Sequence, residues 1–386
     1  MGTWTLIGLI IGFVLIHPGA RSDPPGATWI EEVPGTPGKD ARLVLRGSTG
    51  MSRLLAREFL SSWDVDVSFD ATRALFAGRR TTGAREGIYQ VSFDSGSIAT
   101  LVELDGLLES PRYGPGGWIF FLWNREADPD VRALRGGVLH AIPPRIGADP
   151  ERISFHPGFD RGPVVTPSGR LIFSSSDSSG LLSMRRDGTD ISAWHEDHGL
   201  GKGQWDPLAW ESSSLLARSP AGSVFRIPES RHYTECLPAM DSDSLTRRKV
   251  EPRPMPKPDP SLVNARAKTG EIFCFDALEG TVEDDPRPVD LRGRIHMPAF
   301  EEGPPAFSAE FPLAGDGSFS LRVPADRPFR FEVLDGSGAI LGSMKSHIWL
   351  RPGEQRGCIG CHEPRGRAPV NRIIEALDHP PGEVES

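Results

Sequence analysis

The chain contains 386 residues, carries a formal net charge of −9 and has a pI near 5.6. This acidic balance argues against a nucleic-acid partner, because nucleic-acid binding usually requires a basic surface. The 43 glycines and 36 prolines predict many turns and short strands rather than long helices, and the length allows two or three domains with their own cores.

The chain begins with an apolar run from Trp4 to Ile16, followed by small residues and prolines. This run is too short for a membrane span, which needs about 20 residues. It predicts a secretory signal peptide over residues 1–22, with cleavage near Gly19-Ala20, and therefore a periplasmic or otherwise exported protein. Because no Lys or Arg precedes the run, an uncleaved N-terminal anchor is the alternative. Only in that case do we expect contact with a membrane.

Residues 23–250 contain four similar stretches, each with a turn followed by an apolar strand. Comparable positions in these stretches, Asp70, Gly114, Pro167 and Trp210, are separated by 44, 53 and 43 residues. A repeat of this size, with about four strands in each unit, is typical of β-propeller blades, which bury their faces by stacking. The sequence therefore predicts a propeller-like domain, with a plain β-sandwich or an irregular β-domain as the alternative.

The number of blades is left open by the sequence. Four or five units are clear, and a closed ring would also need strands in the less regular segments "WIEEVPGTPG" and "RHYTECLPAM". Residues 251–261 then alternate proline with polar residues, which predicts an extended polyproline II linker.

Residues 262–350 predict a small antiparallel β-sandwich. Apolar and polar residues alternate over 318–323 and again over 329–333, which is typical of strands that are buried on one face. The glycine-containing segment 335–338 supplies a hairpin turn after the second of these strands. The overall prediction is a mainly β protein with a propeller-like domain, a sandwich, and a short C-terminal segment over 351–386.

Three other groups of residues could have a function, but each also fits an ordinary structural role. His195 and His198 flank two acidic residues and could bind a metal, and Glu283, Asp284 and Asp285 could bind calcium, but solvated polar loops explain both groups. Cys236 and Cys274 could form a disulfide in an exported protein. Cys274 also fits the interior of a strand as a small apolar residue.

The C-terminal segment contains a Cys-x-x-Cys-His motif made by Cys358, Cys361 and His362. This spacing is the attachment pattern for one c-type haem, in which two thiols bond to the porphyrin and the histidine binds the iron. A zinc site usually needs two spaced pairs of ligands, and a thioredoxin-like pair needs a βαβ unit. A structural disulfide would leave His362 without a role. The motif therefore predicts one haem c.

The stretch "WLRPGEQRGCIGCHEPRGRAPV" and the preceding "DGSFSLRVPADRPFRFEVLDGSGAIL" resemble the middle, haem-bearing region of the hydrazine synthase alpha subunit family. The likeness is specific over residues 315–369 and looser over the propeller, where the "RRDGTD" turn resembles TolB-type blades. It implies an exported c-type haem protein. It does not imply hydrazine chemistry, because that alpha subunit carries a second haem and works with other subunits, whereas this chain has one Cys-x-x-Cys-His.

The ligand on the far side of the iron separates an electron carrier from a catalyst. His347, Met344 and His379 are candidate sixth ligands, and a C-terminal tyrosine is excluded because Tyr233 is the last tyrosine. The first functional hypothesis is single-electron transfer with a redox partner protein. The second is a haem oxidoreductase whose open iron binds a small nitrogen or oxygen compound. The third is a binding or assembly protein that uses the propeller.

Overall fold

The computed structural model describes most of the chain outside its N-terminal segment. The described residues are 28–33, 41–47, 49–127, 136–145, 147–178, 180–196, 203–211, 213–229, 237–238, 247–279, 290–300, 304–360 and 372–384. Several predictions fall outside these ranges, namely the signal peptide, His198, Cys236, the acidic residues at 283–285, Cys361 and His362. No helix in the described ranges is long and apolar enough to cross a membrane.

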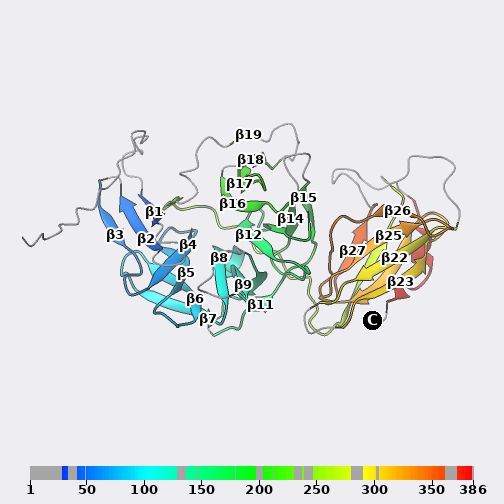
Figure 1. Cartoon of the computed structure of the whole chain (residues 1–386), viewed down its shortest axis with the longest axis horizontal. Helices are drawn as coiled ribbons and strands as arrows, with labels where there is room; N and C mark the ends of the chain where they lie inside the picture. Colours follow the sequence, from blue (N-terminus) through cyan, green and yellow to red (C-terminus); the bar gives the residue numbers. More distant parts are fainter. Residues whose placement is uncertain are drawn as a thin grey trace, which may run out of the picture.

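The regular secondary structure of the described residues is almost entirely β-strand, which confirms the mainly β fold with a propeller-like domain (Figure 1). The helical turns among the described residues are the short 3-10 turns η1 (Pro115–Gly117) and η4 (Glu375–Asp378). Five four-stranded antiparallel sheets are described between residues 28 and 249. Their strands, sheet by sheet, are β20 (Arg247–Lys249), β1 (Thr28–Val33), β2 (Arg42–Gly47) and β3 (Ser52–Leu54); β4 (Ser61–Val67), β5 (Arg73–Arg79), β6 (Glu86–Ser92) and β7 (Ile98–Leu104); β8 (Leu107–Tyr113), β9 (Ile119–Asn124), β10 (Val138–Ile142) and β11 (Glu151–Arg152); β12 (Asp160–Val165), β13 (Leu171–Ser175), β14 (Gly180–Met184) and β15 (Ser192–Glu196); β16 (Asp206–Glu211), β17 (Ser214–Arg218), β18 (Val224–Pro228) and β19 (Leu237–Pro238).

The first of these sheets combines strands from the two ends of the domain. β20 pairs antiparallel with β1, so that Trp29 lies opposite Lys249. The Arg248 side chain of the same strand donates a hydrogen bond to the carbonyl of Leu208 in β16, at 3.3 Å. The last strand of the domain therefore completes the first sheet and contacts the fifth.

A bulge recurs in the first strand of four successive sheets, β4, β8, β12 and β16. Bulged strands bend and leave backbone groups without ladder partners. Acidic side chains of β4 accept hydrogen bonds from backbone N–H groups of β8. Asp64 accepts from Ser110 at 3.0 Å, and Asp66 accepts from Tyr113 at 2.8 Å. These bonds join the first strands of neighbouring sheets.

Two further four-stranded sheets form a sandwich beyond residue 268. Their strands are β27 (Gln355–Cys358), β21 (Thr269–Cys274), β24 (Phe319–Pro324) and β28 (Gly382–Glu383) in one sheet, and β23 (Phe307–Pro312), β22 (Arg292–Met297), β25 (Arg330–Leu334) and β26 (Ile340–Ser343) in the other. Phe311, Phe319 and Phe331 pack edge-to-face, with ring centroids 5.1–5.8 Å apart. Burial alternates along β24, as the period-two pattern predicts for a strand with one buried face.

The proline-rich linker is bonded to the propeller near both of its ends. Near its start, Arg253 donates to the Asp66 carboxylate at 3.1 Å and to the Val67 carbonyl at 2.8 Å. Near its end, Arg186 donates to the carbonyl of Asp259 at 2.8 Å. The linker thus connects the second and fourth sheets of the propeller before it enters the sandwich.

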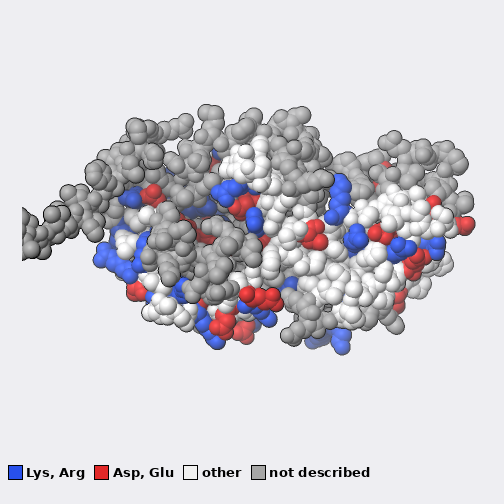
Figure 2. Space-filling model, in the orientation of Figure 1, with Lys and Arg blue, Asp and Glu red and all other residues white. Residues whose placement is uncertain are grey.

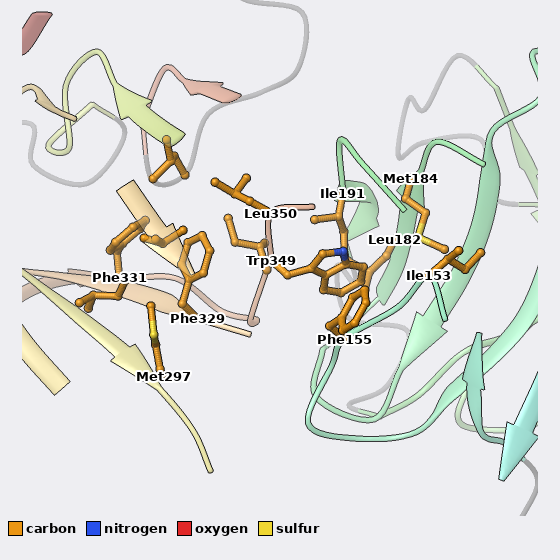
Figure 3. Close-up of a cluster of buried hydrophobic side chains, with 14 of the residues drawn as sticks. Ile153, Phe155, Leu182, Met184, Ile191, Met297, Phe329, Phe331, Trp349 and Leu350 are labelled. Carbon is orange, nitrogen blue, oxygen red and sulfur yellow. The ribbon is translucent and has the colours of Figure 1, made fainter. Parts of the chain in front are cut away.

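Trp349 lies at the centre of a hydrophobic core that the two domains share. Its side chain is fully buried, and its indole N–H donates to the carbonyl of Gly188 at 3.0 Å. In Figure 3, its ring lies among Phe155, Leu182 and Ile191, which the propeller contributes. A large aromatic side chain buries up to about 250 Å², so this contact is a main source of docking energy.

Polar bonds surround Trp349 along residues 346–354, which we call the docking segment. Arg351 donates to the Asp187 carbonyl at 2.7 Å and pairs with Asp326 at 2.8 Å. The buried Glu354 carboxylate accepts bonds from the backbone N–H groups of Asp190 and Arg351, both at 2.8 Å. Burial raises the pKa of Glu354 more than these bonds lower it. The docking segment is therefore held to the propeller by apolar and polar contacts together.

We expect Trp349→Ala to lower the free energy of unfolding by about 3–5 kcal/mol, because it removes a fully buried aromatic side chain. Urea unfolding followed by tryptophan fluorescence and circular dichroism measures the change. Leu262→Ala is the matched control near the domain boundary, since half of its side chain is exposed, and it should cost less than about 1 kcal/mol. Equal costs for the two variants would contradict the role of Trp349.

Candidate functional site

Cys358 is the last residue of β27, and the structure fixes its backbone. β27 runs parallel to β21 and is the outermost strand of its sheet in the described part of the chain, with Cys358 opposite Cys274. The carbonyls of Cys358 and Ile359 accept hydrogen bonds from the N–H groups of Phe275 and Asp276, at 2.9 and 3.2 Å. The first residues of the predicted haem motif are therefore anchored to the loop after β21.

Gly360, inside the motif, lies against the backbone of the same loop. A Cβ atom added to Gly360 would lie only 2.6 Å from the carbonyl oxygen of Glu279. A backbone atom cannot move aside as a flexible side chain can, so this close approach requires glycine. The sequence pattern predicts no role for Gly360. In the structure, its missing side chain lets this part of the motif pack on the sandwich.

A small cavity of about 60 Å³ lies beside Cys358, inside the sandwich. Its wall is mostly apolar and includes Phe311, Phe319 and Ile348. A porphyrin is much larger than this space, so the cavity itself could not hold a haem bonded to Cys358. The position of Cys358 fits such attachment, because the residue is half-buried on an outermost strand, with an apolar interior on one side.

The three predicted sixth ligands lie in different places. Met344 lines the same small cavity as Cys358, and its sulfur accepts a hydrogen bond from the Phe331 N–H at 3.4 Å. His347 lines a separate, larger cavity at the domain boundary. His379 is exposed directly after η4. The structure therefore brings Met344, and not His347, to the cavity beside Cys358.

His347 joins the two domains through Asp177, a contact that the sequence analysis missed. Its backbone N–H and its Nδ1 both contact the Asp177 Oδ2 atom, at 3.0 and 2.7 Å. Burial raises the pKa of Asp177, but the hydrogen bonds and charge of His347 outweigh burial and hold that pKa below its usual value. Asp177 precedes His347 by 170 residues, and no sequence pattern links them.

The remaining predicted residues contribute no described site. His195 lies in β15, and the structure describes only its backbone, whereas His198 and the acidic residues at 283–285 fall outside the described ranges. Cys274 is buried in β21, and Cys236, its suggested disulfide partner, is not among the described residues. In those ranges no three or more His, Cys, Asp or Glu side chains are grouped so that they could hold a metal ion.

The comparisons with known proteins agree with the resemblance seen in the sequence. The family model for the hydrazine synthase alpha subunit middle domain matches residues 309–363, which begin within β23 and include β24 to β27, the docking segment and the whole Cys-x-x-Cys-His motif. The comparison with curated proteins gives no match. The likeness to the hydrazine synthase alpha subunit family is therefore confirmed over this part of the sandwich.

Among solved structures, the hydrazine synthase of Kuenenia stuttgartiensis has a similar fold. It superposes with a TM-score of 0.69 at 15% identity, over 92% of this chain and 72% of that chain. TolB from Acinetobacter baumannii aligns at 11% identity with a TM-score of 0.44, over 85% of this chain and 65% of that chain. The first likeness shows a shared fold across both domains.

We expect Gly360→Ala to destabilise the sandwich by about 1–3 kcal/mol, since the added methyl group meets a backbone carbonyl. Ile359→Ala is the matched control in the same motif. Chemical unfolding of both variants measures the difference, and proteolysis should cut Gly360→Ala faster near the motif. A Gly360→Ala variant as stable as Ile359→Ala would refute the required close approach.

Proposed function

We propose that this protein, similar to the hydrazine synthase alpha subunit family over its middle domain, is an exported haem protein that transfers single electrons. Cys358 and Cys361 would hold one haem c through thioether bonds, and His362 would bind the iron. The observation that carries the proposal is that the family match ends on the complete motif, where β27 fixes Cys358 at the edge of the sandwich.

A bound haem would supply the one-electron chemistry, and the residues of this chain would set its position and surroundings. The backbone bonds from Phe275 and Asp276 hold the start of the motif. The apolar wall beside Cys358 would keep water from one side of the attachment point. Because Cys358 lies on an outermost strand of the described sheet, a haem attached there would be within reach of a redox partner protein, as electron transfer requires.

The same observations support one alternative, a haem oxidoreductase that acts on a small nitrogen or oxygen compound. The fold shared with the Kuenenia stuttgartiensis hydrazine synthase favours it. The two functions differ in the iron, which has six ligands in an electron carrier and an open position in such an enzyme. The apolar N-terminal run supports export. Export would also agree with a bound haem c, because c-type haem is attached outside the cytoplasm.

We expect the mature protein, made in the periplasm with a cytochrome c maturation system, to carry the added mass of one haem. The Cys358→Ala and Cys361→Ala double variant should lose this mass. Cys274→Ala is the matched control, because Cys274 lies beside Cys358 but outside the motif, and it should keep the haem. Intact-mass spectrometry makes the measurement, and an unmodified wild-type mass would refute the haem assignment.

We expect the absorption spectrum of the reduced protein to stay unchanged on addition of carbon monoxide, because an electron carrier has both axial positions filled. Met344→Ala, His347→Ala and His379→Ala are compared in parallel, and the variant that gains carbon monoxide binding identifies the sixth ligand. Immediate binding by the wild-type protein would contradict the electron carrier and support the open-iron oxidoreductase.

A further inference from the structure

A cavity of about 460 Å³ lies between the sandwich and the propeller, separate from the one beside Cys358. One wall is the end of the sheet β23-β22-β25-β26, and the other side is closed by Asp177 of the propeller and by residues 345–347. Cavities of about 300–1,000 Å³ are typical of small-molecule sites. The size therefore suits a small ligand.

Polar side chains of three adjacent strands form one row across this wall. Strand register places His296 opposite both Ser308 and Arg330. The Nδ1 atom of His296 lies 3.1 Å from the Ser308 hydroxyl, and its Nε2 atom lies 2.9 Å from the Glu332 carboxylate. The imidazole thus lies between the Ser308 hydroxyl and the Glu332 carboxylate while it lines the cavity.

The Arg330 guanidinium also lines the cavity, and its contacts with neighbouring side chains are long. Its Nη1 donates to the Ser343 hydroxyl at 3.4 Å, and its Nη2 lies 3.6 Å from Glu332. A guanidinium has five N–H donors in a planar fork that matches carboxylates and other oxyanions. Since the Arg330 side chain is about a third exposed, a ligand in the cavity can reach it.

The opposite rim adds Lys345 and His347. Asp177 contacts the Nδ1 edge of His347, so the Nε2 edge is the one left for a ligand. Among the described residues, two carboxylates near the cavity have partners: Asp177 contacts His347, and the buried Glu332 contacts Arg294 at 3.5 Å and His296 at 2.9 Å. Three basic side chains, Arg330, Lys345 and His347, thus line the cavity in a protein whose net charge is −9.

The same cavity also has an apolar part, made by Met297, Pro298 and Phe307. We propose that the cavity binds a small organic anion. Its carboxylate or similar oxyanion head contacts Arg330, Lys345 and His347, and its short apolar body packs on the apolar part of the cavity. On the face drawn in Figure 2, basic and acidic side chains are interspersed among uncharged ones. The proposal does not depend on the haem, because it uses none of the motif residues.

Titration calorimetry of the full-length protein with butyrate tests the proposal, with butylammonium as the probe of opposite charge. We expect butyrate to bind and butylammonium not to bind. Arg330→Gln should weaken butyrate binding about tenfold, the amount expected when one charged hydrogen bond is lost. Arg292→Gln is the matched control, because Arg292 lies on β22, pairs with Glu310 and does not line the cavity. It should bind butyrate within about twofold of the wild type.

Lys345→Gln, at an exposed position on the rim, is a second variant that should weaken binding severalfold without disturbing the fold. Unfolding midpoints confirm that each variant remains folded. The absorption spectrum of the haem is recorded during the titration, because an anion that binds the iron would change it. Absence of butyrate binding up to about 10 mM, or binding that Arg330→Gln and Lys345→Gln leave unchanged, would overturn the proposal.

Discussion

The burial of Trp349 between the two domains is the contact on which the rest of the structure depends. It places the docking segment against the fourth sheet of the propeller, and β27 begins directly after that segment. Only three residues lie between Glu354, which is bonded to the propeller, and Cys358. The position of the motif is therefore determined by the propeller as well as by the sandwich, although the propeller supplies none of the motif residues.

The Glu354 carboxylate, which is buried at this interface, has hydrogen-bond partners for both of its oxygens. A buried carboxylate without partners would cost several kcal/mol, so the two backbone bonds to Glu354 are necessary for the close approach of the domains. The Asp187 carboxylate holds the end of the linker against the propeller. It accepts bonds from Ser261 at 2.9 Å and from the Leu262 N–H at 2.8 Å. Linker, docking segment and propeller thus meet around one turn, residues 187–190.

Local patterns in the sequence predicted the local structure well. The alternation over 318–323 predicted β24, and the repeat predicted the stacked sheets. Long-range contacts left no comparable signal. The sequence suggests His347 as an iron ligand because it lies near the motif in the chain, whereas its partner Asp177 is far away in sequence. The position of Cys274 opposite Cys358 likewise depends on a parallel pairing that periodicity cannot reveal.

The pairing of β1 with β20 has a consequence for how the protein is made. Trp29 and Lys249 lie opposite each other although 220 positions separate them in the chain, from 29 to 249. Until β20 has paired with β1, one edge of the first sheet has unpaired backbone groups that can join strands of other molecules. Such distant pairing is also slow to form. Newly made chains therefore pass through an aggregation-prone stage that a circular permutant beginning at β20 would shorten.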